Sequence, residues 1–208
     1  MFVPNKFQLT DQKLLEQFIA HNRFGVMITT DLNATHLPFM CEADENGDLC
    51  LFAHMARANP HWKNSEGSRA LVVFTGPHAY ISPTWYANRP AVPTWNYTAV
   101  HCYGKISLLD ENDTQQSMDQ LVSLYEPQLL ANEQVMPEEY QQRLRKAVVG
   151  FKLVIDNIQG KEKLGQHRTT EDQLGVHTAL QQSSNPVAQL LAEYMLKRNL
   201  GIGDKQSS

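Results

Sequence analysis

Residues 54–60 (HMARANP) combine side chains that could bind an anion. Arg57 supplies a guanidinium, and Asn59 followed by Pro60 is a typical helix start, in which the asparagine caps the first turn. The first N–H groups of a helix and its dipole favour a negative charge beside them. The segment therefore predicts a phosphate site at Ala56, Arg57 and Asn59. The alternative is an ordinary N-cap beside a solvated arginine, and the spacing alone does not separate the two interpretations.

Histidines near this segment raise the question of a metal site. The candidate ligands are His54, His61, His78 and His101. None lies in an HExxH or Cys/His pattern, so we expect no metal and interpret His54 as a neighbour of the phosphate. The sequence also has no GxSxG, Walker or GxGxxG motif, which argues against a serine hydrolase, a P-loop NTPase and a Rossmann dehydrogenase.

Aromatic side chains are dense between residues 80 and 97. They are Tyr80, Trp85, Tyr86, Trp95 and Tyr97. Such residues can fill a core or a dimer interface. They also suit a flat apolar cleft for a planar ring system, with polar groups such as His78 and Asn96 at its rim.

The segment 160–168 (GKEKLGQHR) is polar and basic, and we expect it to form a loop after a strand. A charge run of this kind is usually a solvated face. Lys163, Gln166 and Arg168 nevertheless supply donors for an anionic cofactor or for the carbonyls of a flavin.

The elements that must position these residues are mainly strands in the first half of the chain. Runs of β-branched and apolar residues with short turns predict about six strands before residue 110, the spacing of an antiparallel barrel. The expected strands are 24–30, 35–42, 48–53, 69–74, 78–83 and 94–109, with turns at Asn46-Gly47 and Gly76-Pro77. Pro38 inside the second strand implies an edge or a bulge.

The second half is predicted to be mostly helical, with one return to strand. The expected helices are 113–130, 137–146, 171–181 and 186–199, the strand is 148–158, and a further helix near the N-terminus is capped by Thr10. We therefore predict a mainly β (α+β) fold. It forms a single domain over residues 1–200, with peripheral and C-terminal helices and a frayed tail at 201–208.

Composition and charge restrict the class of protein. A formal net charge of −4 argues against a generic nucleic-acid binder. Cys41, Cys50 and Cys102 lack CxxC spacing, so we interpret them as small buried hydrophobic residues in a reducing compartment. There is neither a signal-peptide pattern nor an apolar stretch of membrane length, and we expect a cytoplasmic protein.

Several of these segments together resemble the PaiB family of FMN-binding split-barrel proteins, which are described as negative transcriptional regulators. The segments, in order, are MFVPNKF, HMARANPHW, GPHAYISPTWY, VPTWNYTAVHCYGKI, VVGFKLVI and GKEKLGQHR. The resemblance extends to about residue 180. It implies a six-stranded antiparallel split β-barrel of the pyridoxamine-phosphate-oxidase and flavin-reductase type, and a homodimer with FMN at the subunit interface.

The resemblance also implies roles for particular residues. His54, Ala56, Arg57 and Asn59 would hold the FMN phosphate, and Trp95, Asn96 and Tyr97 would face the flavin. Lys163, Gln166 and Arg168 would complete the cofactor-binding set. The family motif is closer to KLSQNR, so Gly165 and His167 depart from it.

Three functions follow as hypotheses. The first is a flavin-dependent regulator or redox sensor involved in negative transcriptional regulation, with direct DNA contact disfavoured by the net charge and by the lack of a helix-turn-helix signal. The second is a flavin-dependent oxidoreductase with an unknown small-molecule substrate. The third is a haem-binding split-barrel protein in which His54, His101 or His167 is the axial ligand.

Overall fold

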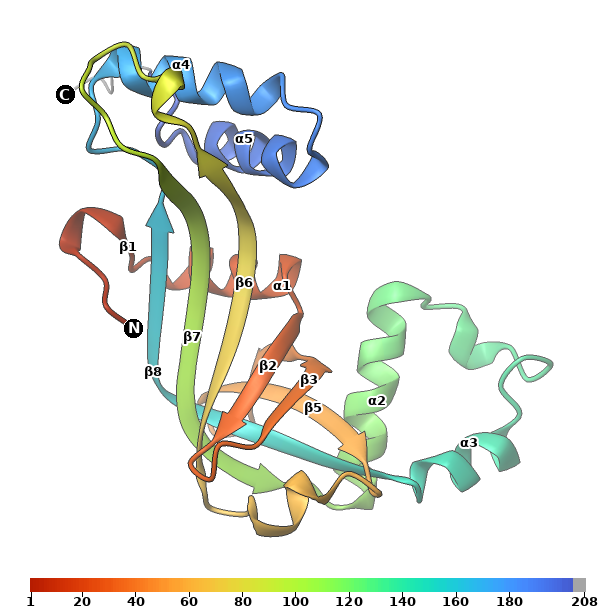
Figure 1. Cartoon of the computed structure of the whole chain (residues 1–208). Coiled ribbons are helices and arrows are strands. Elements are labelled where there is room, and N and C mark those ends of the chain that lie inside the picture. The colour runs from red at the N-terminus through yellow and green to blue at the C-terminus, as the bar shows by residue number, and fades with distance from the viewer. Residues whose placement is uncertain (204–208) are drawn as a thin grey trace. The chain divides into compact units, whose positions relative to one another are not determined.

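The computed structural model describes residues 1–203, which form one antiparallel β-sheet and five α-helices (Figure 1). The strands are β1 (Gln8–Leu9), β2 (Phe24–Thr29), β3 (Ala34–Pro38), β4 (Met40–Ala43), β5 (Leu49–Ala56), β6 (Arg69–Ile81), β7 (Thr94–Leu108) and β8 (Val148–Lys163). The helices are α1 (Gln12–His21), α2 (Glu111–Tyr125), α3 (Glu138–Arg145), α4 (Thr170–Gln181) and α5 (Pro186–Arg198). Short 3₁₀ helices are η1 (Asn5–Phe7), η2 (Pro60–Asn64), η3 (Pro83–Trp85) and η4 (Leu129–Ala131).

The strand order is β3-β2-β6-β7-β8-β5-β4, and β1 pairs separately with β8. The predicted strand 35–42 is present as two halves, because Pro38 has no N–H to donate and the chain changes partner there. β3 pairs with β2, whereas β4 pairs with β5. With β3 and β4 counted as one and the two-residue β1 set aside, the sheet has six strands, the number that the family resemblance implied. Only five of them lie before residue 110, one fewer than predicted, because the expected strands 69–74 and 78–83 form the single strand β6.

The chain divides into two compact units. Unit 1 contains Met1–Leu15, Thr75–Val100 and the chain from Gln159 onward, and unit 2 contains Glu16–Phe74 and His101–Ile158. β6, β7 and β8 each contribute residues to both units. The single domain over 1–200 stays a prediction.

The core of unit 2 is built around aromatic rings. Phe39 lies between β3 and β4 and is fully buried. Its ring makes edge-to-face contacts with Phe74, at 5.6 Å between centroids, and with Phe151, at 6.3 Å. At Gly104 of β7 a side chain would clash with the carbonyl oxygen of Val154 in β8, so this close approach of two strands requires glycine.

The core of unit 1 lies under the C-terminal helices. α4 and α5 lie side by side beside the end of β6 and the start of β7 (Figure 1). Leu164, Leu180, Leu191 and Met195 are buried in this cluster, and so is Ile202. Gly201 and Ile202, the first residues of the predicted tail, are thus buried, and its residues 204–208 lie outside the described part of the chain.

Three local predictions are wrong. The turn at Gly76-Pro77 is absent because β6 runs through it. β2 pairs with β6 only as far as Val73, so Pro77 falls where no β2 partner needs its N–H. The first helix is capped by Asp11, whose carboxylate accepts the N–H of Leu14, and not by Thr10. Residues 160–163 of the predicted loop belong to β8.

Within residues 1–203, none of the helices is long and apolar enough to cross a membrane.

Candidate functional site

The predicted cofactor residues fall into the two units. His54, Ala56, Arg57 and Asn59 belong to unit 2, and Trp95, Asn96, Tyr97, Lys163, Gln166 and Arg168 belong to unit 1.

Arg57 follows directly after β5, and its guanidinium is held at the start of β8. Its Nε donates to the carbonyl of Lys146 at 2.8 Å, and its Nη2 donates to that of Val148 at 2.9 Å. The indole of Trp62 lies 5.8 Å from the guanidinium carbon, and its Nε1 donates to the carbonyl of Arg57 at 2.9 Å. The exposed arginine is thus fixed in direction, and Nη1 remains for a ligand.

Asn59 caps a helix, as the Asn-Pro pair predicted. Its Oδ1 accepts the N–H of His61 at 3.0 Å, and Pro60 occupies the first helical position. The helix is a 3₁₀ helix of five residues, however, so its dipole adds little. Any anion site here depends mainly on Arg57 and not on the helix.

A cavity of about 440 Å³ adjoins Arg57. Its basic lining residues are Arg57, Arg145 and Lys146, and Trp62 forms part of its wall. Asp110, Glu111 and Glu138 also line it, and Glu138 pairs with Arg145 at 3.0 Å. The cations that remain for a phosphate are therefore Arg57 and Lys146.

His54 lies inside β5, opposite Gly150 of β8, and is half-buried. Burial lowers the pKa of His54, which favours a neutral imidazole. Among the residues described, no group of three His, Cys, Asp or Glu side chains is arranged to hold a metal ion.

His61 joins the capped helix to the β2–β3 turn. Thr29 Oγ1 lies 2.7 Å from its Nε2, and Thr35 Oγ1 lies 2.7 Å from its Nδ1. Thr29 donates its proton to Asp31, so it accepts from Nε2–H, while Nδ1 accepts from Thr35. This network suits a neutral ring, and burial lowers the pKa of His61.

Stability should accordingly depend on pH in a defined direction. Burial lowers the pKa values of His54, His61, His101 and His167, so the unfolded chain binds protons more readily than the folded one near their ordinary value of about 6.5. We expect the free energy of unfolding, measured in urea, to fall as the pH drops from 7.5 to 5.5. His61→Gln should flatten this dependence, and a slope that this variant leaves unchanged would contradict the assignment.

In unit 1, Trp95 and Tyr97 of β7 lie on one face of the strand and Asn96 lies on the other. The Trp95 side chain is 49% exposed, and its Nε1 donates to Nδ1 of His78 at 3.3 Å. The ring of Tyr80 meets it edge-to-face at 6.2 Å. Asn96 is only 3% exposed, so it is placed to support this ring face and not to touch a ligand on it.

Two lysines of β8 lie beside these rings. Lys163 Nζ donates to Thr94 Oγ1 at 2.7 Å and to the carbonyl of Trp95 at 2.9 Å. Lys161 Nζ lies 5.0 Å from the centroid of the Tyr97 ring and donates to the carbonyl of Phe2 at 3.0 Å. Lys161 was not among the predicted cofactor-binding residues, whereas Tyr80 and His78 were expected in the aromatic cleft and at its rim. Residues two apart in a strand lie on the same face, so the spacing of Lys161 and Lys163 is the signal that could have identified Lys161.

The last two of the predicted cofactor-binding residues, Gln166 and Arg168, have different roles. Gln166 fixes the chain after β8, because its amide donates to the carbonyl of Glu162 at 2.6 Å and accepts the N–H of Leu164 at 2.8 Å. The Arg168 guanidinium stacks on Tyr86, with its carbon 4.5 Å from the ring centroid. Its Nε is buried and, within residues 1–203, has no hydrogen-bond partner. A buried donor of this kind fits an acceptor on a ligand.

Comparison with known proteins identifies the family. The family model described as "Putative FMN-binding domain" matches residues 1–157. The protein named "Protease synthase and sporulation protein PAI 2" from Bacillus subtilis (strain 168) is 36% identical over 202 residues, covering 94% of this chain and 96% of that protein. The chain belongs to the PaiB family of FMN-binding proteins. FMN as the cofactor is thereby confirmed, as is the resemblance drawn from the sequence.

Solved structures similar to this PaiB-family chain confirm the split-barrel fold. The "FAD and Heme binding protein" from Mycobacterium smegmatis has a TM-score of 0.59 at 17% identity, over 75% of this chain and 73% of that one. The flavocytochrome Anf3 from Azotobacter vinelandii has a TM-score of 0.56 at 15% identity, over 77% and 72% of the two chains. At these identities the likeness concerns the fold alone.

The residues present in the PaiB-family chain fit FMN. The cofactor has a dianionic phosphate and a planar ring with hydrogen-bonding edges, and it supplies the redox chemistry when bound. Arg57 is oriented and exposed for the phosphate, Trp95 and Tyr97 offer ring faces, and Arg168 has an orphaned donor. The chemistry of both sets therefore suits an anionic aromatic ligand.

The cysteines of the PaiB-family chain should be unreactive in the folded state. Burial raises the pKa of Cys41 to about 12 and that of Cys50 to about 11, and it also raises that of Cys102. A shift of this size lowers the thiolate fraction of Cys41 at neutral pH roughly a thousandfold. We expect iodoacetamide to label the native protein far more slowly than the urea-unfolded chain, as followed by intact mass. Equal labelling rates would contradict the prediction.

Proposed function

We propose that this chain is a cytoplasmic FMN-binding homodimer that acts as a flavin-dependent regulator or redox sensor in negative transcriptional regulation. The observation that carries the proposal is the exposed ring of Trp95 and the half-buried ring of Tyr97 beside Lys161 and Lys163, in a chain of an FMN-binding family. A sensor needs the flavin to be bound and oriented, and it needs no catalytic triad.

Within this proposal each predicted residue has a role. Arg57 binds the phosphate, and His54, Ala56 and Asn59 lie next to it in the chain; the N–H of Asn59 already donates to the carbonyl of Ala56 at 2.9 Å. Trp95 and Tyr97 stack on the ring, and Asn96 holds them from behind. Lys163 and Arg168 donate to the ring edge, and Gln166 keeps the chain after β8 in place. The assignment rests on the chemistry of each group and not on a distance between the groups.

The homodimer is supported by large apolar side chains left exposed in unit 1. Phe2 is 84% exposed, Tyr80 is 48% exposed and Trp95 is 49% exposed. Aromatic residues gathered on a surface are typical of protein interfaces. Light scattering should give twice the 23.6 kDa of one chain, and Tyr80→Glu should shift the protein towards the monomer. A monomeric wild-type protein would contradict the proposal.

Regulation is proposed to act through a partner or a small molecule, because the net charge of −4 disfavours direct binding to DNA. The experiment compares transcripts in a strain lacking this chain with those in the parent. A set of transcripts should rise and should return to the parental level with the wild-type protein but not with Arg57→Ala. If no transcript rises, the regulatory role is wrong. A mobility shift of upstream DNA at low ionic strength would instead indicate direct contact.

Haem binding is a second candidate, since the neighbour from Mycobacterium smegmatis is named for haem as well as FAD. His54, His101 or His167 would be the axial ligand. Adding haem to the purified protein tests it, and the absence of a Soret shift would end this alternative. An oxidoreductase role would appear as steady oxidation of NADH or NADPH that depends on added FMN.

A further inference from the structure

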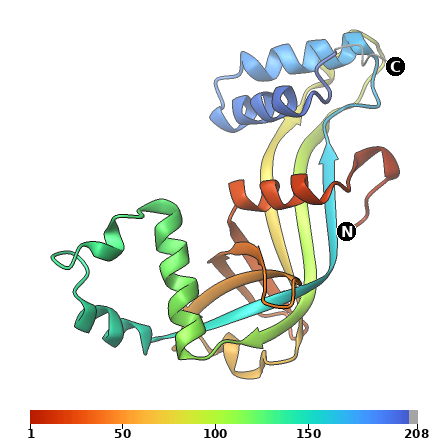
Figure 2. The same ribbon diagram turned by 180° about the vertical axis from the view of Figure 1, so that it is seen from behind.

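A strongly acidic segment lies between β7 and β8. Residues 110–142, named here the acidic excursion, contain eight Asp or Glu residues and no Lys, Arg or His. The rest of the chain has fourteen acidic and eighteen basic residues, so it is net positive although the whole chain is at −4. The excursion consists mainly of α2, η4 and the first part of α3, all within unit 2 (Figure 2). Such an asymmetry points to a partner of the opposite charge.

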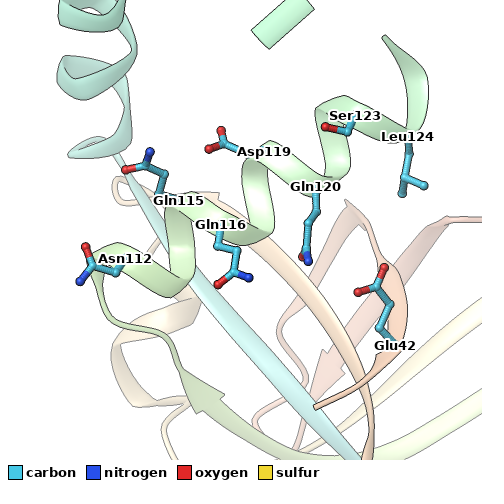
Figure 3. A pocket seen from close by; sticks show the side chains of 8 residues that line it. All are labelled: Glu42, Asn112, Gln115, Gln116, Asp119, Gln120, Ser123 and Leu124. Atoms are coloured by element: carbon cyan, nitrogen blue, oxygen red, sulfur yellow. The ribbon is translucent and has the colours of Figure 1, made fainter. Parts of the chain in front are cut away.

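A groove of about 650 Å³ runs along one face of α2. Asn112, Gln116, Asp119, Gln120 and Leu124 line it from the helix, and Glu42 lines it from β4. Figure 3 shows Gln116 and Gln120 pointing from α2 towards the side on which Glu42 lies. A second hollow of about 330 Å³ shares Glu42, Gln116 and Gln120 with the groove. It adds Asp44, Glu45 and Asp113 to the acidic lining.

Four polar side chains of this groove are unpartnered in the described part of the chain. Within residues 1–203, the side chains of Asn112, Gln116, Asp119 and Gln120 take part in no hydrogen bond or ion pair. Lys152, which lines the second hollow, is already paired with Asp44 at 2.7 Å. A row of hydrogen-bonding groups on one helix face is therefore available to a ligand.

The spacing of the amides matches an extended peptide. Asn112, Gln116 and Gln120 follow one another at four-residue intervals, a rise of about 6 Å along a helix. Alternate residues of an extended chain are about 6.6 Å apart, so each amide can meet every second peptide group of a strand laid along α2. A side-chain amide both donates and accepts, as a peptide group does. From Asn112 to Leu124 the helix rises about 18 Å, enough for five or six extended residues.

We propose that the groove along α2 docks an extended segment of a partner protein that is rich in lysine and arginine. The amides bind the backbone of the segment, and Asp119 and Glu42 pair with its basic side chains. Leu124, which is 48% exposed at the end of the row, contacts an apolar residue of the segment. Charge complementarity fixes the chemistry of the occupant and speeds its approach.

The test uses a fluorescein-labelled octapeptide of alternating lysine and glycine as the probe, with the FMN-loaded protein. Fluorescence anisotropy should show saturable binding that weakens as salt is added, because exposed charges are screened. The double variant Gln116→Ala/Gln120→Ala should weaken binding at least tenfold. The matched double variant Gln17→Ala/Gln181→Ala removes two exposed glutamines elsewhere and should leave the affinity within twofold. No saturable binding to the wild-type protein would overturn the proposal.

Charge reversal and a free polyamine separate peptide docking from attraction by charge alone. Asp119→Lys should abolish peptide binding, whereas Glu193→Lys on the exposed side of α5 should not. Spermine, the free polyamine, carries the same kind of charge without peptide groups. Peptide docking predicts that it displaces the labelled peptide only weakly, whereas attraction by charge alone predicts that it displaces the peptide fully. If the glutamine variant binds the peptide as the wild type does, or if both control variants lose it, the groove is not the docking site. Circular dichroism melts of all variants confirm that each is folded.

Discussion

Arg57→Ala should lower the affinity for FMN about a hundredfold while leaving the affinity for riboflavin within about twofold. The two ligands differ only in the phosphate, so their comparison isolates the group that Arg57 is proposed to bind. Hydrogen bonds to charged groups are worth about 1.5–3 kcal/mol each, and about 1.4 kcal/mol changes a dissociation constant tenfold. Because bonds to the carbonyls of Lys146 and Val148 hold the guanidinium in place, little ordering is needed when the phosphate binds.

The matched control for this variant is Arg69→Ala. Arg69 is an exposed arginine of the same unit, and it pairs with Asp156 at 2.6 Å. Losing an exposed ion pair costs at most about 1 kcal/mol of stability. Arg69 is not among the residues that are proposed to bind the phosphate. Flavin fluorescence titrations of the wild type and the two variants with both ligands measure the six dissociation constants. Equal losses for FMN and riboflavin in Arg57→Ala would mean that the arginine acts on the fold and not on the phosphate.

Glu162→Ala should reduce the free energy of unfolding by about 3–5 kcal/mol. Glu162 lies on β8 between Lys161 and Lys163 and is only 2% exposed. It accepts hydrogen bonds from Tyr194 Oη at 2.6 Å and from Arg198 Nε at 2.7 Å and Nη2 at 3.1 Å, all from α5. Removing the carboxylate leaves the Arg198 guanidinium partly buried without its counter-charge, which is the costly outcome for a buried pair.

This prediction links the fold to the site. Glu162 holds α5 against the strand that carries the two lysines beside Trp95 and Tyr97. Urea unfolding measures the loss, and Glu193→Ala on the exposed side of α5 should change stability by less than about 0.5 kcal/mol. The double variant Glu162→Ala/Arg198→Met should recover part of the loss, because it removes the unpaired cation. A single variant as stable as the wild type would contradict the role of the ion pair.

Much of the fold followed from the sequence because its signals are local. The Asn46-Gly47 turn, the Asn59-Pro60 cap and the helix predicted over 186–199 depend on neighbouring residues, and all three are present, the helix as α5 over 186–198. The prediction of a turn at Gly76-Pro77 was wrong because the pairing of a neighbouring strand decides whether a proline is tolerated within a strand. The extent of β8 was underestimated because its end pairs with β1, more than 150 residues earlier in the chain.

The candidate site was less predictable. Nothing near Arg57 in the sequence indicates that the carbonyls of Lys146 and Val148 hold its guanidinium. Gln166 looked like a ligand by type, but its amide serves the backbone of its own loop. Asn96 and Trp95 are adjacent in sequence, yet strand alternation puts them on opposite faces. Side-chain type suggested the chemistry, and only tertiary packing decides which atoms remain available for a ligand.

The central claim is that this chain binds FMN through an arginine-held phosphate and an aromatic face, and a titration of the purified protein with FMN tests it most directly. Flavin fluorescence should change saturably as Trp95 and Tyr97 stack on the ring, and the melting temperature should rise with FMN concentration, because a ligand bound only by the folded state stabilises it. Unchanged flavin fluorescence together with an unchanged melting temperature at saturating FMN would contradict the account.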